Sequence, residues 1–391
     1  MQTPLQTKAS QMQDKFRERY RVPARVYRAP GRVNLIGEHT DYNDGFVMPA
    51  AIEFYVWLAI APRRDRKLVV HSLNYDESAE INLNEENPRP RNHWSDYVQG
   101  VALMLQRAQQ PLQGANLLVS GDVPIGSGLS SSAAIEVVTG LALLENSGVP
   151  IDRVELAKIC RRAENDFVGA RVGIMDQFAS CFGHAQHALM LDCRSLEYHL
   201  LPLPQDVSLV ICNTMVRHDL ATSQYNARRK ECEEAVSLLH RSLPNIRALR
   251  DVRPDDLHRH ASELPATIFK RARHVVTENA RVEQAATALQ QEDLPTLGQL
   301  MGESHRSLRD DYQVSCPELD LMVDLATKAP GVYGSRMTGG GFGGCTINLV
   351  NARSVQAFRN RVAQGYEKDT GIASQIFVSS AAEGAAEVTS A

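Results

Sequence analysis

The segment between residues 121 and 138 has the composition of a phosphate-binding loop. It reads GDVPIGSGLSSSAAIEVV and joins an apolar run typical of a strand to one typical of a helix. Glycines let backbone N–H groups turn toward a ligand, and a helix N-terminus carries a partial positive charge, so an anion can bind there without a lysine. A flexible linker or a serine-capped helix is the alternative. We expect ligand contacts from seven consecutive residues: Gly126, Ser127, Gly128, Leu129, Ser130, Ser131 and Ser132.

This loop is neither a Walker A loop nor part of a protein kinase. The Walker motif requires GxxxxGK[ST], and the sequence contains no Gly-Lys dipeptide. The HRD and DFG signatures of protein kinases are also missing. A second glycine-rich loop, MTGGGFGGC at 337–345, lies between two predicted strands. Its backbone could approach a ligand closely, and a bulged turn is the alternative.

A polar cluster near the N-terminus is suited to a substrate with several hydroxyl groups. The segment 29–45, APGRVNLIGEHTDYNDG, combines one arginine, three carboxylates, a histidine and two asparagines. Side chains of this kind hold hydroxyls through charge-assisted hydrogen bonds, and the carboxylates would repel an anion. A neutral polyol therefore fits best. A metal site is less well supported, because His39 and Asp41 are two residues apart with no second histidine in register.

The overall composition is that of an ordinary globular protein. The 391 residues predict two or three domains of roughly 150 residues. The net charge of −4, with basic residues interspersed, argues against a nucleic-acid surface. The longest strongly apolar stretch covers 54–62, too short for the about 20 residues that cross a bilayer, and the polar N-terminus is unlike a signal peptide. Seven cysteines without a CxxC pair indicate reduced thiols, so we expect a cytoplasmic protein.

Helices and strands alternate irregularly along the chain, which favours an α+β fold over a doubly wound parallel sheet. The 152–169 helix is the clearest, with Asp152 as its N-cap. The Pro-containing segment 200–206 is the expected boundary between domains 1–205 and 206–391, and the terminal residues 381–391 are expected to fray. Strands are predicted at 46–62, 116–124, 187–192, 207–214, 332–337, 345–350 and 374–379, and helices at 132–148, 152–169 and through most of 223–330.

In this order, the three segments resemble the three motifs of the GHMP small-molecule kinases. GRVNLIGEHTDYNDG is similar to the galactokinase signature within that superfamily, VPIGSGLSSSAA to the ATP-binding motif, and TGGGFGGC to the third motif. The resemblance covers about residues 20–350. It implies ATP-dependent, Mg²⁺-assisted phosphorylation of the anomeric hydroxyl of α-D-galactose. It also implies an S5-like N-terminal domain, a ferredoxin-like C-terminal domain and an active site between them.

The resemblance also implies a role for individual side chains. Asp176, in GIMDQFAS, matches the catalytic base, and Arg32 matches the arginine that stabilises the transferring phosphoryl group. Ser132 and Glu164 match the Mg²⁺ ligands, although Glu164 lies off the apolar stripe of its helix and should point away from the core. A helix cap, a surface ion pair and a solvated glutamate are the structural alternatives. The sugar-binding positions match Glu38, His39, Thr40, Asp41 and Tyr225, the last of which shares a helical stripe with apolar residues.

Other functions remain open at this point. A sugar sensor that kept the fold would bind galactose and ATP without turnover, but the intact Ser132-Ala133-Ala134 and Asp176 favour an enzyme. A related kinase could use N-acetylgalactosamine, another hexose, mevalonate or homoserine, although the carboxylates of the first motif argue against anionic acceptors. A dinucleotide site is disfavoured, because GSGLSS lacks the third glycine of GxGxxG. The expected partners are galactose and ATP alone, bound to a monomer.

Overall fold

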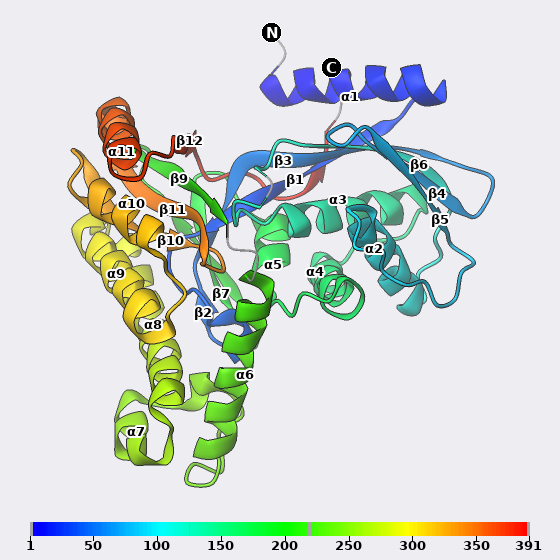
Figure 1. Ribbon diagram of the computed structural model, residues 1–391. Helices are drawn as coiled ribbons and strands as arrows, with labels where there is room; N and C mark the ends of the chain where they lie inside the picture. The colour runs from blue at the N-terminus through cyan, green and yellow to red at the C-terminus, as the bar shows by residue number, and fades with distance from the viewer. Residues whose placement is uncertain (1–2, 125, 218–220, 389–391) are drawn as a thin grey trace.

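The computed structural model describes residues 3–124, 126–217 and 221–388, and it has a two-domain α+β architecture (Figure 1). Within these residues, the first sheet has six strands in the order β13-β1-β3-β6-β4-β5. All neighbouring strands are antiparallel except the parallel pair β4 and β6. The strands are β1 (Arg25–Asn34), β3 (Pro49–Pro62), β4 (Lys67–Ser72), β5 (Glu77–Asn82), β6 (Ala115–Gly121) and β13 (Ala386–Glu387).

Helices cover both faces of this sheet. The N-terminal helix α1 (Pro4–Tyr20) lies on one face, where Met12 and Phe16 pack with Trp57 (Figure 1). The other face carries the main hydrophobic core. It is covered by α2 (Ser95–Arg107), α3 (Ser131–Asn146), α4 (Arg153–Arg162), the π-helical turn η2 (Ala163–Val168) and α5 (Met175–Phe182).

The second part of the chain forms an antiparallel sheet in the order β10-β11-β9-β12, which matches the expected ferredoxin-like layer. On one face, α10 and α11 bury Met322, Phe358 and Tyr366 against β9 and β11. On the other, Leu297 and Met301 of α9 join the main core. The elements are β9 (Val207–Arg217), β10 (Val332–Thr338), β11 (Gly343–Asn351), β12 (Gln375–Ser379), α8 (Ala266–Gln290), α9 (Leu294–Ser307), α10 (Pro317–Thr327) and α11 (Val355–Thr370).

A small three-stranded sheet and a helical extension complete the described chain. The sheet has the order β2-β7-β8, with β2 (Phe46–Val47), β7 (His187–Asp192) and β8 (Tyr198–Pro202). The extension contains α6 (Ala221–Leu239), α7 (Pro254–Arg259) and short turns η3 (Leu249–Asp251) and η4 (Ala261–Glu263). The remaining turns are η1 (Asp41–Asn43), η5 (Leu308–Tyr312) and η6 (Ala352–Ser354).

The structure confirms the predicted strands and helices, with two corrections. The carboxylate of Asp152 accepts from the N–H groups of Val154 and Glu155, as an N-cap does. The expected helix over 152–169, however, changes to a π-helix after Arg162. The expectation that 381–391 frays is wrong for its described part, because β13 pairs with β1 through Tyr27 and Arg28. Residues 389–391 lie outside the described residues.

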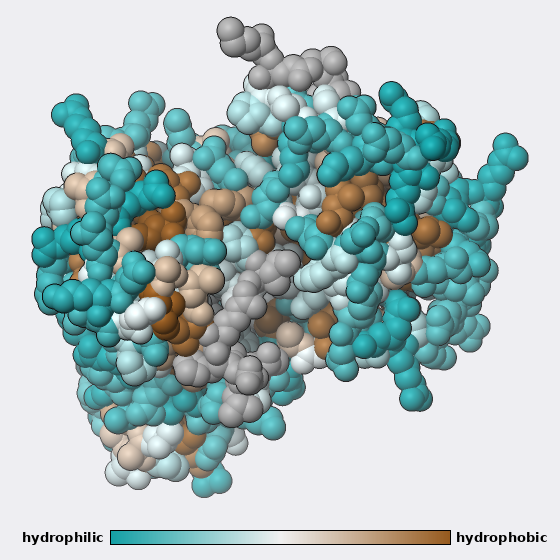
Figure 2. Space-filling model, turned by 45° about the horizontal axis from the view of Figure 1, so that its top comes forward, coloured by the Kyte–Doolittle hydropathy of each residue, from teal (hydrophilic) through white to brown (hydrophobic). Residues whose placement is uncertain are grey.

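The surface shown in Figure 2 is mostly hydrophilic, and the cysteines form no disulfides. On the face in Figure 2, hydrophilic side chains predominate and apolar residues form small patches between them. All seven cysteines are buried and unpaired. Among the described residues, no helix combines the length and apolar character needed to span a membrane.

Candidate active site

A cavity of about 830 Å³ lies where β1, the start of α3 and the loop between β10 and β11 meet. It therefore receives residues from both halves of the chain. Most of the predicted site residues line it: Arg32, Glu38, His39, Asp41, Gly126, Gly128, Leu129, Ser130, Ser131, Ser132, Glu164, Asp176 and Tyr225.

Arg32 and Asp176 form a two-pronged ion pair in the cavity. The Arg32 Nε and Nη2 atoms each donate to one carboxylate oxygen of Asp176 at 2.8 Å. The Arg32 side chain is 6% exposed and that of Asp176 is 20% exposed, so the carboxylate is the member that reaches the cavity space. Burial lowers the pKa of Arg32, but the carboxylates of Asp176, Glu38 and Asp41 raise it above its ordinary value. Arg32 therefore carries a positive charge in an acidic site.

The glycine-serine loop 126–132 is hydrogen-bonded to this ion pair. The third Arg32 nitrogen, Nη1, donates to the Gly128 carbonyl oxygen at 2.6 Å, and the Ser130 hydroxyl donates to Asp176. Ser130 has a φ of +58° and immediately precedes α3. The first N–H groups of α3 have no acceptor within the helix, and its first residues, Ser131 and Ser132, line the cavity. Ser127 is not among the residues that line the cavity: it is 1% exposed, and its hydroxyl donates to the Pro124 carbonyl oxygen at 2.6 Å.

Glu164 is buried, contrary to the expectation that it points away from the core. It is 5% exposed, because the π-helical turn η2 shifts the side chains out of the regular helical period. Burial raises its pKa to about 7, the charge of Asp176 adds to this, and a hydrogen bond from Ser132 lowers it. Gln177, which the sequence did not indicate, donates from Nε2 to Glu164 at 2.6 Å and to Glu136 at 3.0 Å.

These residues fit Mg²⁺ only as part of its coordination shell. Ser132 and Glu164 supply a hydroxyl and a carboxylate, the oxygen donors that Mg²⁺ prefers. Within the described residues, no cluster of three or more His, Cys, Asp and Glu side chains has metal-binding geometry. Because Mg²⁺ usually keeps several waters and binds through substrate phosphates, one or two protein oxygens are sufficient.

Four of the sugar-binding candidates, Glu38, His39, Asp41 and Tyr225, form a polar part of the cavity wall. Glu38 accepts from the Gly339 N–H at 2.6 Å and is 2% exposed. His39 Nδ1 is 2.8 Å from the Tyr42 hydroxyl, and burial lowers its pKa well below the ordinary value, so the imidazole is neutral. The Tyr225 ring is 5.4 Å from the His39 ring, which confirms neither a sugar contact nor a purely apolar role but places Tyr225 at the cavity wall.

Asp41 and Thr40 differ in their surroundings. Burial raises the pKa of Asp41 to about 7, and the charges of Asp176 and Glu38 add to this effect. The Thr40 hydroxyl instead donates to the carbonyl oxygens of Gly37 and Phe46, at 2.8 and 2.6 Å. Thr40 is fully buried and is not among the residues that line the cavity, so it shapes the loop that carries its neighbours.

The cavity also has an aromatic end that the sequence did not indicate. Tyr75, Trp94 and Tyr97 line it, and the Tyr75 and Trp94 rings are stacked with centroids 6.2 Å apart. These residues lie in connections and on α2, away from the glycine motifs. Only the aromatic character of WSDY at 94–97 could have pointed to Trp94 and Tyr97.

Three family models match the chain. They are the galactokinase galactose-binding signature over residues 14–62, the GHMP kinase N-terminal domain over 96–184 and the GHMP kinase C-terminal domain over 285–368. A galactokinase from Roseiflexus sp. is 47% identical over 97% of both chains. One from Actinobacillus succinogenes is 45% identical over 96% of this chain and 98% of its own.

Solved structures agree with these matches. The crystal structure of Lactococcus lactis galactokinase complexed with galactose superposes with a TM-score of 0.94 and 37% identity, covering 97% of this chain and 99% of that one. Methanococcus jannaschii mevalonate kinase shares the fold at 18% identity and a TM-score of 0.66, over 93% of this chain and all of its own. Fold and cavity thus define a GHMP kinase.

Within the GHMP kinases, the galactose-binding signature and the similar relatives of nearly equal length all point to the galactokinases. The chain belongs to the galactokinase family. It is an ATP-dependent sugar kinase that phosphorylates galactose.

Proposed function

We propose that Asp176 is the general base and that the product is α-D-galactose 1-phosphate. The observation that carries this proposal is the two-pronged Arg32–Asp176 pair at the cavity. Asp176 accepts the proton of the C1 hydroxyl as that oxygen bonds to the γ-phosphorus, while the bond from phosphorus to the ADP oxygen breaks. A positioned base of this kind contributes roughly 10²–10⁴-fold to the rate.

Arg32 has a second task in this proposal. It lies between the base and the Gly128 carbonyl of the nucleotide loop, so its charge is close to both reactants. Phosphoryl transfer passes through a loose transition state in which charge spreads over the phosphoryl oxygens. A fixed guanidinium stabilises that charge without reorganising during the reaction.

Galactose is held by the polar end of the cavity. Glu38 and Asp41 accept hydrogen bonds from sugar hydroxyls, neutral His39 pairs with a further hydroxyl, and Tyr225 packs against the sugar ring. Their burial supports this role, because buried polar groups need partners that a polyhydroxylated substrate supplies. Thr40 acts indirectly, through the loop that its hydroxyl fastens.

ATP occupies the rest of the cavity. Its phosphates lie against the backbone N–H groups of the loop 126–132 and of the glycine loop 339–344, and its base lies at the aromatic end beside Trp94. Ser132 and Glu164 would hold Mg²⁺, with Gln177 fixing the Glu164 carboxylate. When bound, the ion neutralises phosphate charge. The proposed catalytic unit is a monomer.

The test is sugar-dependent ADP release with Mg·ATP, combined with ³¹P NMR of the product. We expect release with D-galactose, little with D-glucose, and a resonance coupled to the anomeric proton. Phosphorylation at another carbon would refute the proposed product. Faster ADP release with N-acetylgalactosamine than with galactose would make N-acetylgalactosamine the best acceptor. No release from folded protein that still binds ATP would favour a sugar sensor.

A further inference from the structure

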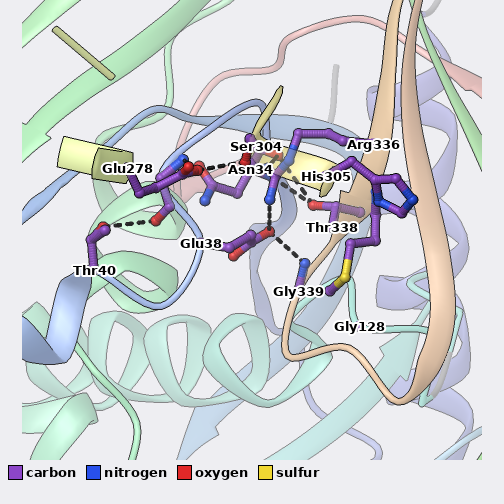
Figure 3. Close-up of polar contacts among 12 residues, drawn as sticks. Asn34, Glu38, Thr40, Gly128, Glu278, Ser304, His305, Arg336, Thr338 and Gly339 are labelled. Carbon is purple, nitrogen blue, oxygen red and sulfur yellow. Dashed lines mark hydrogen bonds and ion pairs between the residues drawn. The ribbon is translucent and has the colours of Figure 1, made fainter. Parts of the chain in front are cut away.

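A fully buried arginine, Arg336, lies on β10 just before the second glycine-rich loop (Figure 3). Its Nη1 donates to the Asn34 carbonyl oxygen at 2.9 Å, and its Nη2 lies 3.6 Å from Glu38 Oε1. Neither Nε nor Nη2 has a hydrogen-bond partner within the part of the chain that the structure describes. A buried cation with so few partners is costly to keep unless it acts on nearby carboxylates.

The carboxylate on which Arg336 acts is Glu38. Burial raises the pKa of Glu38 above its ordinary value, and the charges of Arg336 and then Arg32 partly offset that rise. Arg336 and the Gly339 N–H share the same Glu38 oxygen, Oε1. In Figure 3 Glu38 lies between Arg336 and Gly339, joined to both by dashed lines. Arg336 thus faces the same carboxylate oxygen that accepts from the Gly339 N–H.

Gly339 in turn rests on the nucleotide loop. Its φ of +85° suits glycine, and a Cβ atom there would lie 2.9 Å from the Gly128 carbonyl oxygen. The same carbonyl accepts from Arg32 at 2.6 Å. A second close approach joins Gly344, where a Cβ would lie 3.1 Å from the Ser127 carbonyl oxygen. The two glycine loops are therefore in contact, and the position of one restricts that of the other.

We infer that Arg336 is a positioning residue that couples galactose binding at Glu38 to nucleotide binding at the two glycine loops. The inference rests on the proposed role of Glu38 in binding the sugar. A sugar hydroxyl that fixes the Glu38 carboxylate also fixes the Gly339 N–H and, through it, the loop that faces the phosphates. Because coupling between two ligands is reciprocal, nucleotide binding strengthens galactose binding by the same factor.

The test measures the galactose dissociation constant by titration calorimetry, with and without saturating ADP and MgCl₂. In the unaltered protein we expect ADP to tighten galactose binding about fivefold or more, the lower end of typical couplings. In Arg336→Met this factor falls below about twofold, and Arg336→Lys, which keeps the charge, retains part of it. Arg28→Met is the matched control, because Arg28 is a 6% exposed arginine of β1 that is not among the residues that line the cavity. It leaves the factor unchanged.

Two results would overturn the inference: an unaltered protein with no coupling, or an Arg336→Met variant with full coupling. If Arg336→Met does not fold, the lysine variant decides, since an undiminished factor in Arg336→Lys contradicts the role assigned to the guanidinium. Glu38→Gln separates this inference from the proposed function. Unchanged galactose affinity in Glu38→Gln refutes sugar binding by Glu38, whereas weaker affinity combined with full coupling in Arg336→Met refutes the coupling alone.

Discussion

Galactose binding should lose strength between pH 8 and pH 6 because Asp41 becomes protonated. Burial raises the pKa of Asp41 to about 7, and the neighbouring charges of Asp176 and Glu38 add to this. A group with that pKa is about nine-tenths ionised at pH 8 and about one-tenth ionised at pH 6. If only the carboxylate accepts the sugar hydroxyl, the dissociation constant of galactose rises about tenfold over this range.

The assay is calorimetric titration of galactose at pH 6, 7 and 8, without nucleotide or metal. In Asp41→Asn, binding is weaker than at pH 8 in the unaltered protein and varies less than about twofold with pH. Glu164→Gln is the matched control, because Glu164 also has a pKa of about 7 but lies at the proposed metal position. It keeps the tenfold dependence. A pH-independent dissociation constant in the unaltered protein, or an unchanged slope in Asp41→Asn, would refute the reasoning.

Three further predictions concern packing and buried charge. Asp176→Ala leaves the Arg32 guanidinium unpaired and should lower the free energy of unfolding by about 3 kcal/mol in urea denaturation, with no change contradicting the ion pair. Gly173→Ala would place the new Cβ within 3 Å of three atoms of the Asp41 side chain, Oδ2, Cγ and Cβ. The displaced Asp41 should lower kcat/KM for galactose by up to about a hundredfold. An unchanged kcat/KM would refute the tight contact. Burial, with the charge of Glu164, raises the pKa of Glu136 well above the ordinary value, so the folded state keeps a proton that the unfolded chain releases. Glu136 should therefore lower stability above about pH 4.5 by up to about 1.4 kcal/mol per pH unit, and Glu136→Gln should reduce the loss between urea titrations at pH 5 and 7 by that part.

The motifs of the sequence indicated which distant segments meet at one cavity. The polar segment 29–45 and the two glycine-rich loops lie far apart in the chain, yet they line one cavity. Gly128 and Gly339 have positive φ angles where the two glycine-rich loops approach each other. Glycine adopts such angles readily, so the glycine content of the two segments already indicated a close approach of backbone. The domain boundary near residue 205 stays a prediction. The strand β13, from the end of the chain, lies in the first sheet, so that sheet is not built from residues 1–205 alone.

Features that depend on tertiary contacts were out of reach. The helix α1 is polar apart from a narrow stripe of Ala9, Met12 and Phe16, which becomes a core only against the sheet. The burial of Glu164 follows from a π-helical turn that the regular helical period does not predict. The link from Gln177 to Glu164 joins two helical segments that no local pattern pairs.

The most direct test of the account is the single-turnover rate of Asp176→Asn with saturating galactose and Mg·ATP. Asparagine keeps the volume of the side chain and one of the two acceptors for Arg32, while it removes the carboxylate that would take the proton. We predict a rate roughly 10²–10⁴-fold lower than that of the unaltered protein, with the galactose dissociation constant within about threefold. A variant that retains more than about a tenth of the rate would contradict the assignment of Asp176 as the base.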